Sequence, residues 1–264
     1  MESFIISALC GIGIGILSGL LGIGGGTLMV PFFRMGLDLK AIGATATSLF
    51  TIIPTSIAGC ITHLRNKTCI PTIGLVAGFA GACTSPAGVW LANQSPSFAI
   101  MAATACVIIY SASTMLYKFF KNRPVQSLNN NSTNEEKNFK IRPALFFKTV
   151  LIGISAGVAS GYVGVGGGFL MVPLFDVVLG LPMKKASGTS LLAVCILAIP
   201  GVIVQAMLGN IDYLAGIAMA LGSIPGAMIG GNLIKRVPER TLRLIFALFL
   251  LIVAISLIAN EFLF

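Results

Sequence analysis

The chain has 264 residues, of which 56% are hydrophobic and only 9% are charged. Too few polar side chains remain to cover a soluble globule, so we expect lipid to solvate most of the surface. The formal net charge is +9, but most of the basic residues lie between apolar blocks, a pattern that sets membrane orientation and does not indicate nucleic-acid binding.

The N-terminal residues, MESFIISALCGIGIG, have neither a basic start nor a small-residue cleavage site. We therefore expect a retained first helix and not a cleaved signal peptide. Spacing by four residues, the small-xxx-small pattern of closely packed transmembrane helices, assigns one set of glycines to packing. These are Gly11, Gly15 and Gly19, their counterparts Gly153, Gly157 and Gly161, and the trio Gly222, Gly226 and Gly230.

One stretch of sequence occurs twice. SGLLGIGGGTLMVPFF (18–33) and SGYVGVGGGFLMVPLF (160–175) are identical at 11 of 16 positions. The offset that aligns Ser18 with Ser160 also aligns ATATSL, from Ala44, with ASGTSL, from Ala186. We therefore expect a first membrane repeat over residues 1–120 and a second over 144–264. Between them, residues 121–143 are rich in Asn and in charged residues and are expected to form a flexible linker.

Each glycine cluster precedes three full-length apolar stretches, roughly 44–62, 70–92 and 97–118 in the first repeat, with counterparts at the same offset in the second. Basic residues concentrate in the linker, which the positive-inside rule places in the cytoplasm. Lys184 falls on the same side, so the segment 148–180 must enter the membrane and return. Only about ten apolar residues follow Gly168, enough for half a bilayer. We therefore expect a broken or re-entrant helix hairpin that turns at the glycines.

Each repeat then has five membrane segments, and because five is odd, the second copy is inverted relative to the first. The fold class is accordingly an all-α polytopic membrane protein with two inverted repeats. We expect eight full spans by conventional counting, or about ten membrane segments when the half-length arms are included. With the linker in the cytoplasm, both chain termini are predicted to lie outside.

The glycine clusters are the candidate binding site. Non-helical backbone inside a membrane must face protein or water, so the two clusters are expected to face each other near the bilayer midplane. Free amides at the start of the half-helices that follow, together with the helix dipole, would hold a small anion. Inverted repeats with broken helices are typical of secondary transporters. The candidate glycines are Gly22, Gly24, Gly25 and Gly26, and Gly164, Gly166, Gly167 and Gly168.

Side chains near the clusters complete the candidate site. Thr27 follows the first cluster, and Phe169 stands at the equivalent place in the second, so the two half-sites are chemically unequal. Paired hydroxyls follow at equivalent positions, and they either donate to the anion or bond back to their own helix carbonyls. These pairs are Thr47 with Ser48 and Thr189 with Ser190.

Two ionisable residues stand apart from this site. His63, the only histidine, lies at a predicted cytoplasmic helix end, which favours an interfacial role over proton transfer. Asp176 is a candidate to carry a coupling proton. We find no catalytic constellation and no metal-ligand spacing among the six cysteines, so we expect no enzyme activity, no cofactor and no metal.

The two GxGGGxLMVP motifs, each followed by AxxTSL, resemble the TauE/SafE family of sulfite and organosulfonate exporters, also called the toluene sulfonate uptake permease family. The resemblance covers nearly the whole chain. It implies transport of sulfur-containing anions, such as sulfite, thiosulfate or organosulfonates, across a prokaryotic inner membrane.

The expected partners are the lipid bilayer, a small anionic substrate and a coupling ion, either proton or sodium. Neither the direction of transport nor homo-oligomerisation follows from the sequence. A passive anion channel and a transporter of a different small organic anion are the alternative functions.

Overall fold

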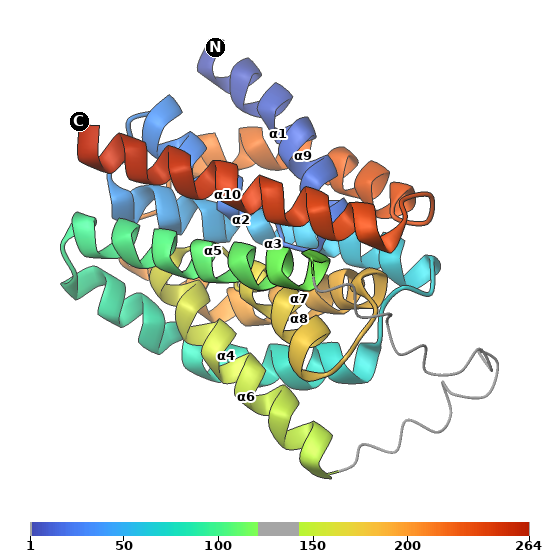
Figure 1. The fold of residues 1–264 in the computed structure, drawn as a ribbon. Coiled ribbons are helices and arrows are strands. Elements are labelled where there is room, and N and C mark those ends of the chain that lie inside the picture. Colours follow the sequence, from blue (N-terminus) through green and yellow to red (C-terminus); the bar gives the residue numbers. More distant parts are fainter. Residues whose placement is uncertain (1, 121–142, 264) are drawn as a thin grey trace.

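The computed structural model describes residues 2–120 and 143–263, and the elements in these ranges are helices (Figure 1). The expected linker therefore lies outside the described residues, except for Pro143. The first repeat contains α1 (Glu2–Leu21), α2 (Gly26–Pro31), the π-helical turn η1 (Phe32–Gly36), α3 (Ala41–Arg65), α4 (Pro71–Gln94) and α5 (Ser97–Phe120). The second contains α6 (Pro143–Val163), α7 (Gly168–Val178), α8 (Met183–Met207), α9 (Tyr213–Leu233) and α10 (Glu239–Leu263).

The helix bounds follow the offset of the sequence repeat. Helices α3 and α8 begin and end at equivalent positions of the two copies, and α2 with η1 (26–36) corresponds to α7 (168–178). Seven helices in the described ranges are long and apolar enough to cross a membrane, one fewer than the eight full spans expected. Helix α10 is a further helix of 25 residues and is not among these seven. The fold is therefore that of an all-α multi-pass membrane protein. The inverted orientation of the two repeats stays a prediction.

Glycines break the first helix of each repeat. Gly22, Gly24 and Gly25 have φ angles of 77°, 83° and 88°. The counterparts in the second repeat, Gly164, Gly166 and Gly167, have φ angles of 74°, 80° and 68°. Residues with a Cβ adopt this left-handed region only with strain, so the run of glycines lets the chain leave one helix and start another in a new direction. A half-length helix follows each break, as the sequence predicted.

The two repeats interlock through their small residues. Helix α1 packs along α9, and in the equivalent pairing α6 packs along α4 (Figure 1). A Cβ on Gly15 would clash with the backbone of Ser223, and a Cβ on Gly157 would clash with the backbone of Gly81. The predicted packing role of the glycines spaced by four is confirmed. Each pairing joins a helix of one repeat to a helix of the other.

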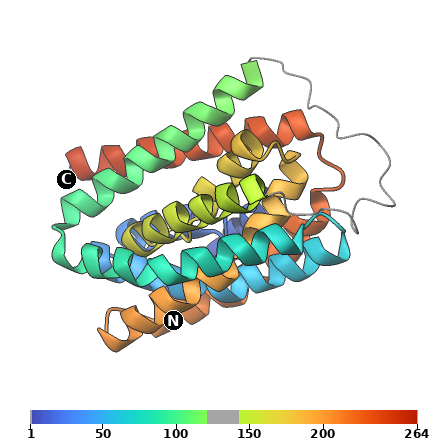
Figure 2. The ribbon, with the colours of Figure 1, turned by 90° about the horizontal axis from the view of Figure 1, so that it is seen from below.

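The other helices surround a central pair formed by α3 and α8. Helix α3 packs against α8, while α5 and α10 lie together along one side of the bundle (Figure 2). Large apolar side chains cover the outside, among them Met207, Leu214 and Ile252. A surface of this kind is suited to lipid and not to water.

The helix interlock gives a first test. Gly15→Ala forces α1 away from α9, so we expect the free energy of unfolding to fall by about 1–3 kcal/mol. Thermal unfolding in detergent would measure this. Gly13→Ala is the matched control, because it adds the same methyl group to the same helix where nothing lies within 4 Å. Equal melting temperatures for the two variants would contradict the interlock.

Candidate functional site

The two glycine turns, residues 22–26 and 164–168, touch each other inside the protein. A Cβ on Gly26 would lie 2.5 Å from the carbonyl oxygen of Val165, and a Cβ on Gly168 would lie 2.5 Å from the carbonyl oxygen of Ile23. Both Ile23 and Val165 are buried. The prediction that the clusters face each other, shielded from lipid, is confirmed.

Each glycine turn rests on a central helix, α3 or α8, that belongs to the other repeat. The turn of the first repeat rests on α8, where Gly22 meets the backbone of Ser187. The turn of the second repeat rests on α3, where Gly164 meets the backbone of Thr45. Each turn therefore depends on the other repeat for its support.

Apolar side chains fill the space beside the turns. Ile52 of α3 would contact a Cβ on Gly24, on Gly26 or on Gly166, and Val194 of α8 would contact a Cβ on Gly24 or on Gly166. Ile52 and Val194 stand at equivalent positions of the two repeats, and both are fully buried. The centre of the molecule is therefore closed in this structure.

The turns supply positive partial charge without a basic side chain. Helix α2 starts after Gly25 and α7 after Gly167, and neither start has a side-chain cap. The first amides of a helix have no acceptor within it, and the dipole gives this end a partial positive charge. Two such ends at one buried place form an environment that favours an anion.

Within each predicted hydroxyl pair, the threonine and the serine lie in different surroundings. Thr47 Oγ1 accepts a hydrogen bond of 3.0 Å from the backbone N–H of Asp212, and Thr189 Oγ1 accepts one of 3.0 Å from the N–H of Ile70. These bonds attach α3 to the start of α9, and α8 to the start of α4. A substrate-binding role for the two threonines stays a prediction.

The serines lie closer to the turns. Ser190 Oγ donates to the carbonyl oxygen of Gly168 at 3.5 Å. The hydroxyls of Ser48 and Thr27 are buried and have no hydrogen-bond partner. Ser56 has the same character and was missed from the sequence, although it stands eight residues after Ser48 and so lies near the same face of a helix.

Comparison with known families decides the identity. The family model described as "Sulfite exporter TauE/SafE" matches residues 7–257. The chain belongs to the TauE/SafE family. Its two glycine turns lie within the matched region, so the resemblance of the motifs is confirmed over nearly the whole chain.

Its relatives carry names of the same kind. The chain is 26% identical to the probable membrane transporter protein YdhB of Bacillus subtilis, with 87% of the chain and 90% of that protein covered. It is 25% identical to the probable membrane transporter protein YunE of the same organism, with 97% of each covered. A probable membrane transporter protein of Haemophilus influenzae is 26% identical, with 92% of the chain and 93% of that protein covered. No solved structure gives a significant match.

In this TauE/SafE protein, His63 does not have the interfacial setting that the sequence predicted. The ring is fully buried, with Nε2 2.8 Å from the carbonyl oxygen of Gly19 and Nδ1 2.8 Å from Thr68 Oγ1. The tight packing of α1 on α9 brings Gly19 close enough to cover the ring. His63 therefore joins α1 to the end of α3.

Asp176 forms an ion pair. Its Oδ1 accepts a hydrogen bond of 2.8 Å from Arg243 Nη2, which joins α7 to α10. Both side chains are largely buried, and removing one partner of such a pair is strongly destabilising. The pair therefore has a structural role, and the coupling-proton role of Asp176 stays a prediction.

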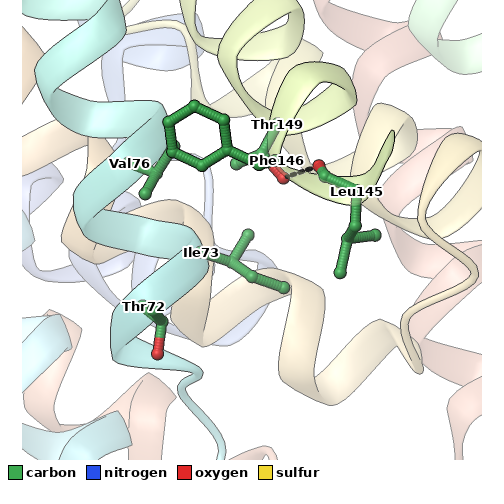
Figure 3. Close-up of a pocket in the computed structure, with 6 residues that line it drawn as sticks. All are labelled: Thr72, Ile73, Val76, Leu145, Phe146 and Thr149. Carbon is green, nitrogen blue, oxygen red and sulfur yellow. Dashed lines mark hydrogen bonds between the residues drawn. The ribbon is translucent and has the colours of Figure 1, made fainter. Parts of the chain in front are cut away.

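A small surface groove lies elsewhere, between α4 and α6 (Figure 3). Its one marked hydrogen bond runs from Thr149 Oγ1 to the carbonyl oxygen of Leu145 at 2.8 Å. No residue of the glycine turns lines it, and its exposed lining is apolar. The groove does not have the donors that an anion site needs.

We call the hydrogen bonds from Asp212 N–H to Thr47 and from Ile70 N–H to Thr189 the threonine anchors. They can be tested without a transport assay. Thr47→Val removes the acceptor for Asp212 N–H while keeping the size of the side chain, so the free energy of unfolding should fall by about 1–3 kcal/mol. Thr47→Ser keeps the hydroxyl and should retain most of the stability. The check is thermal unfolding of both variants in detergent. If Thr47→Val unfolds at the wild-type temperature, the hydrogen bond is not an anchor.

Proposed function

We propose that the protein is a secondary transporter of small sulfur-containing anions: sulfite, thiosulfate or organosulfonates. The anion is held between the starts of α2 and α7, and alternating access carries it across the membrane. The contact between the two glycine turns is the observation that carries this proposal. It brings two sets of helix-start amides to one buried place.

The substrate class rests on chemistry and on the family. The matching model describes a sulfite exporter, whereas the printed names of the relatives state transport without a cargo. A sulfite or sulfonate group is compact and presents several oxygens, so it can accept hydrogen bonds from several amides at once. Amide donors at a helix start bind such groups without a buried arginine.

Alternating access is supported by the closed centre. Ile52 and Val194 fill the space beside the turns, so an anion reaches the amides only after the packing changes. A passive channel requires a continuous open path, which this packing does not favour. The coupling ion in the proposal is a proton or sodium.

Flux through purified protein in liposomes tests the function. Radiolabelled sulfite, thiosulfate and methanesulfonate would be offered with and without a proton or sodium gradient. We expect uptake that saturates with substrate and responds to one of the gradients. Uptake that stays linear in concentration and follows the membrane potential alone would instead establish a channel, and uptake of carboxylates alone would establish a different cargo.

A substitution in the glycine turn tests the site. Gly25→Val forces a branched side chain into a left-handed conformation at the start of α2. We expect the protein to insert but to lose at least nine-tenths of its flux, and Gly167→Val to behave alike. The matched control is Gly209→Val, because Gly209 has a φ of 71° but lies away from the turns with nothing within 4 Å. Unimpaired flux in Gly25→Val would remove the glycine turns from the mechanism.

The proposed orientation places the linker in the cytoplasm and both termini outside the inner membrane. In a cysteine-free background, Ser127→Cys in the linker should react with a membrane-impermeant maleimide only after the cells are permeabilised. Gln94→Cys, at the end of α4 that should lie outside, should react in intact cells. The reverse labelling pattern would show that the whole topology is inverted.

A further inference from the structure

The hydroxyl of Ser56 is directed at the first glycine turn. A Cβ on Gly24 would lie 3.2 Å from Ser56 Oγ. Ser56 is fully buried, and its Oγ has no hydrogen-bond partner. Buried hydroxyls in proteins are almost always paired, so an unpaired one beside the uncapped start of α2 indicates a place for a polar ligand.

Neighbouring hydroxyls of α3 are hydrogen-bonded, so the helix itself does not force the Ser56 hydroxyl to lack a partner. Thr51 Oγ1 donates to the carbonyl oxygen of Thr47 at 2.9 Å, and Thr55 Oγ1 donates to that of Thr51 at 2.8 Å. Back-bonding of this kind is the usual way for a helical hydroxyl to be satisfied. Ser56 does not use it and keeps its donor free.

The equivalent place in the second repeat has no hydroxyl. Ala198 is the counterpart of Ser56, and Phe169 is the counterpart of Thr27. All four side chains are buried. The three atoms nearest to a Cβ on Gly166, the counterpart of Gly24, would be carbon atoms of Ile52 and Val194. Unpaired hydroxyls therefore lie at the first turn, where the second turn has carbon at the matching positions.

We propose that Ser56 is a substrate-binding residue and that the first glycine turn binds the oxygens of the anion, while the second turn contacts its carbon substituent. This rests on the proposed function and narrows it. Ser56 and Thr27 donate hydrogen bonds to the anion beside the amides of α2. The favoured substrate class is accordingly a sulfonate that carries a small apolar group, with inorganic sulfite bound through the same head contacts.

Ser56→Ala tests the head contact in proteoliposomes. Loss of one hydrogen bond to a charged group should raise the half-saturating concentration of sulfite and of methanesulfonate alike, by about tenfold or more. Ser85→Ala is the matched control. It also removes a buried, unpaired hydroxyl, but one that lies against Gly201 and not against the turns, so its half-saturating concentrations should stay within about twofold of wild type. Equal effects of the two substitutions would overturn the assignment of Ser56.

Ala198→Val tests the second half-site by adding bulk at the counterpart of Ser56. We expect the half-saturating concentration of ethanesulfonate to rise at least fivefold more than that of sulfite. An equal rise for both anions would overturn the assignment of the carbon substituent to the second turn. Thermal unfolding of the variant distinguishes a change in selectivity from a loss of folding.

A binding measurement separates this inference from the proposed function. If wild type moves no sulfur anion, the proposed function fails, and Ser56 is then judged from thermal stabilisation by sulfite, phosphate, acetate and chloride. Stabilisation that is lost in Ser56→Ala and kept in Ser85→Ala supports the anion site at the first turn. Stabilisation that is equal in both variants, or absent from wild type, overturns it.

Discussion

Unwound backbone inside a membrane must be covered by protein, and the architecture of this molecule follows from that constraint. Each repeat leaves helical geometry for the residues around Gly24 and Gly166. An unpaired amide facing lipid costs several kcal/mol. The structure avoids this cost by placing one turn against the other, backbone on backbone, between α3 and α8. One turn alone would have no surface of the right shape, which is a physical reason for two copies in one chain.

The long helices of each repeat also depend on the other repeat for their packing. Helix α1 packs on α9, α6 packs on α4, and the threonine anchors also cross between the repeats. The sequence boundaries at residues 120 and 144 therefore mark copies of a unit and not separate packing cores. Glycine makes these contacts possible, because at Gly15 and Gly157 the neighbouring backbone occupies the place of a side chain.

The sequence predicted the features that local chemistry determines. Runs of apolar residues located the helices, and consecutive glycines located the breaks before α2 and α7. It failed where the partner lies far along the chain. The burial of His63 depends on Gly19 after α1 has packed, and the bonds of Thr47 and Thr189 depend on distant loops. Ser56 could have been found from its helical register with Ser48, but its lack of a partner is visible only in three dimensions.

The absence of Lys and Arg from residues 22–27 and 164–169 matters most when the site is empty. A full positive charge left in the centre without its anion would need a substitute counterion, and desolvating it would oppose closure. The helix starts carry only partial charges. In the proposed carrier, the unloaded protein would therefore return through its closed form without a second ion to neutralise the vacant centre.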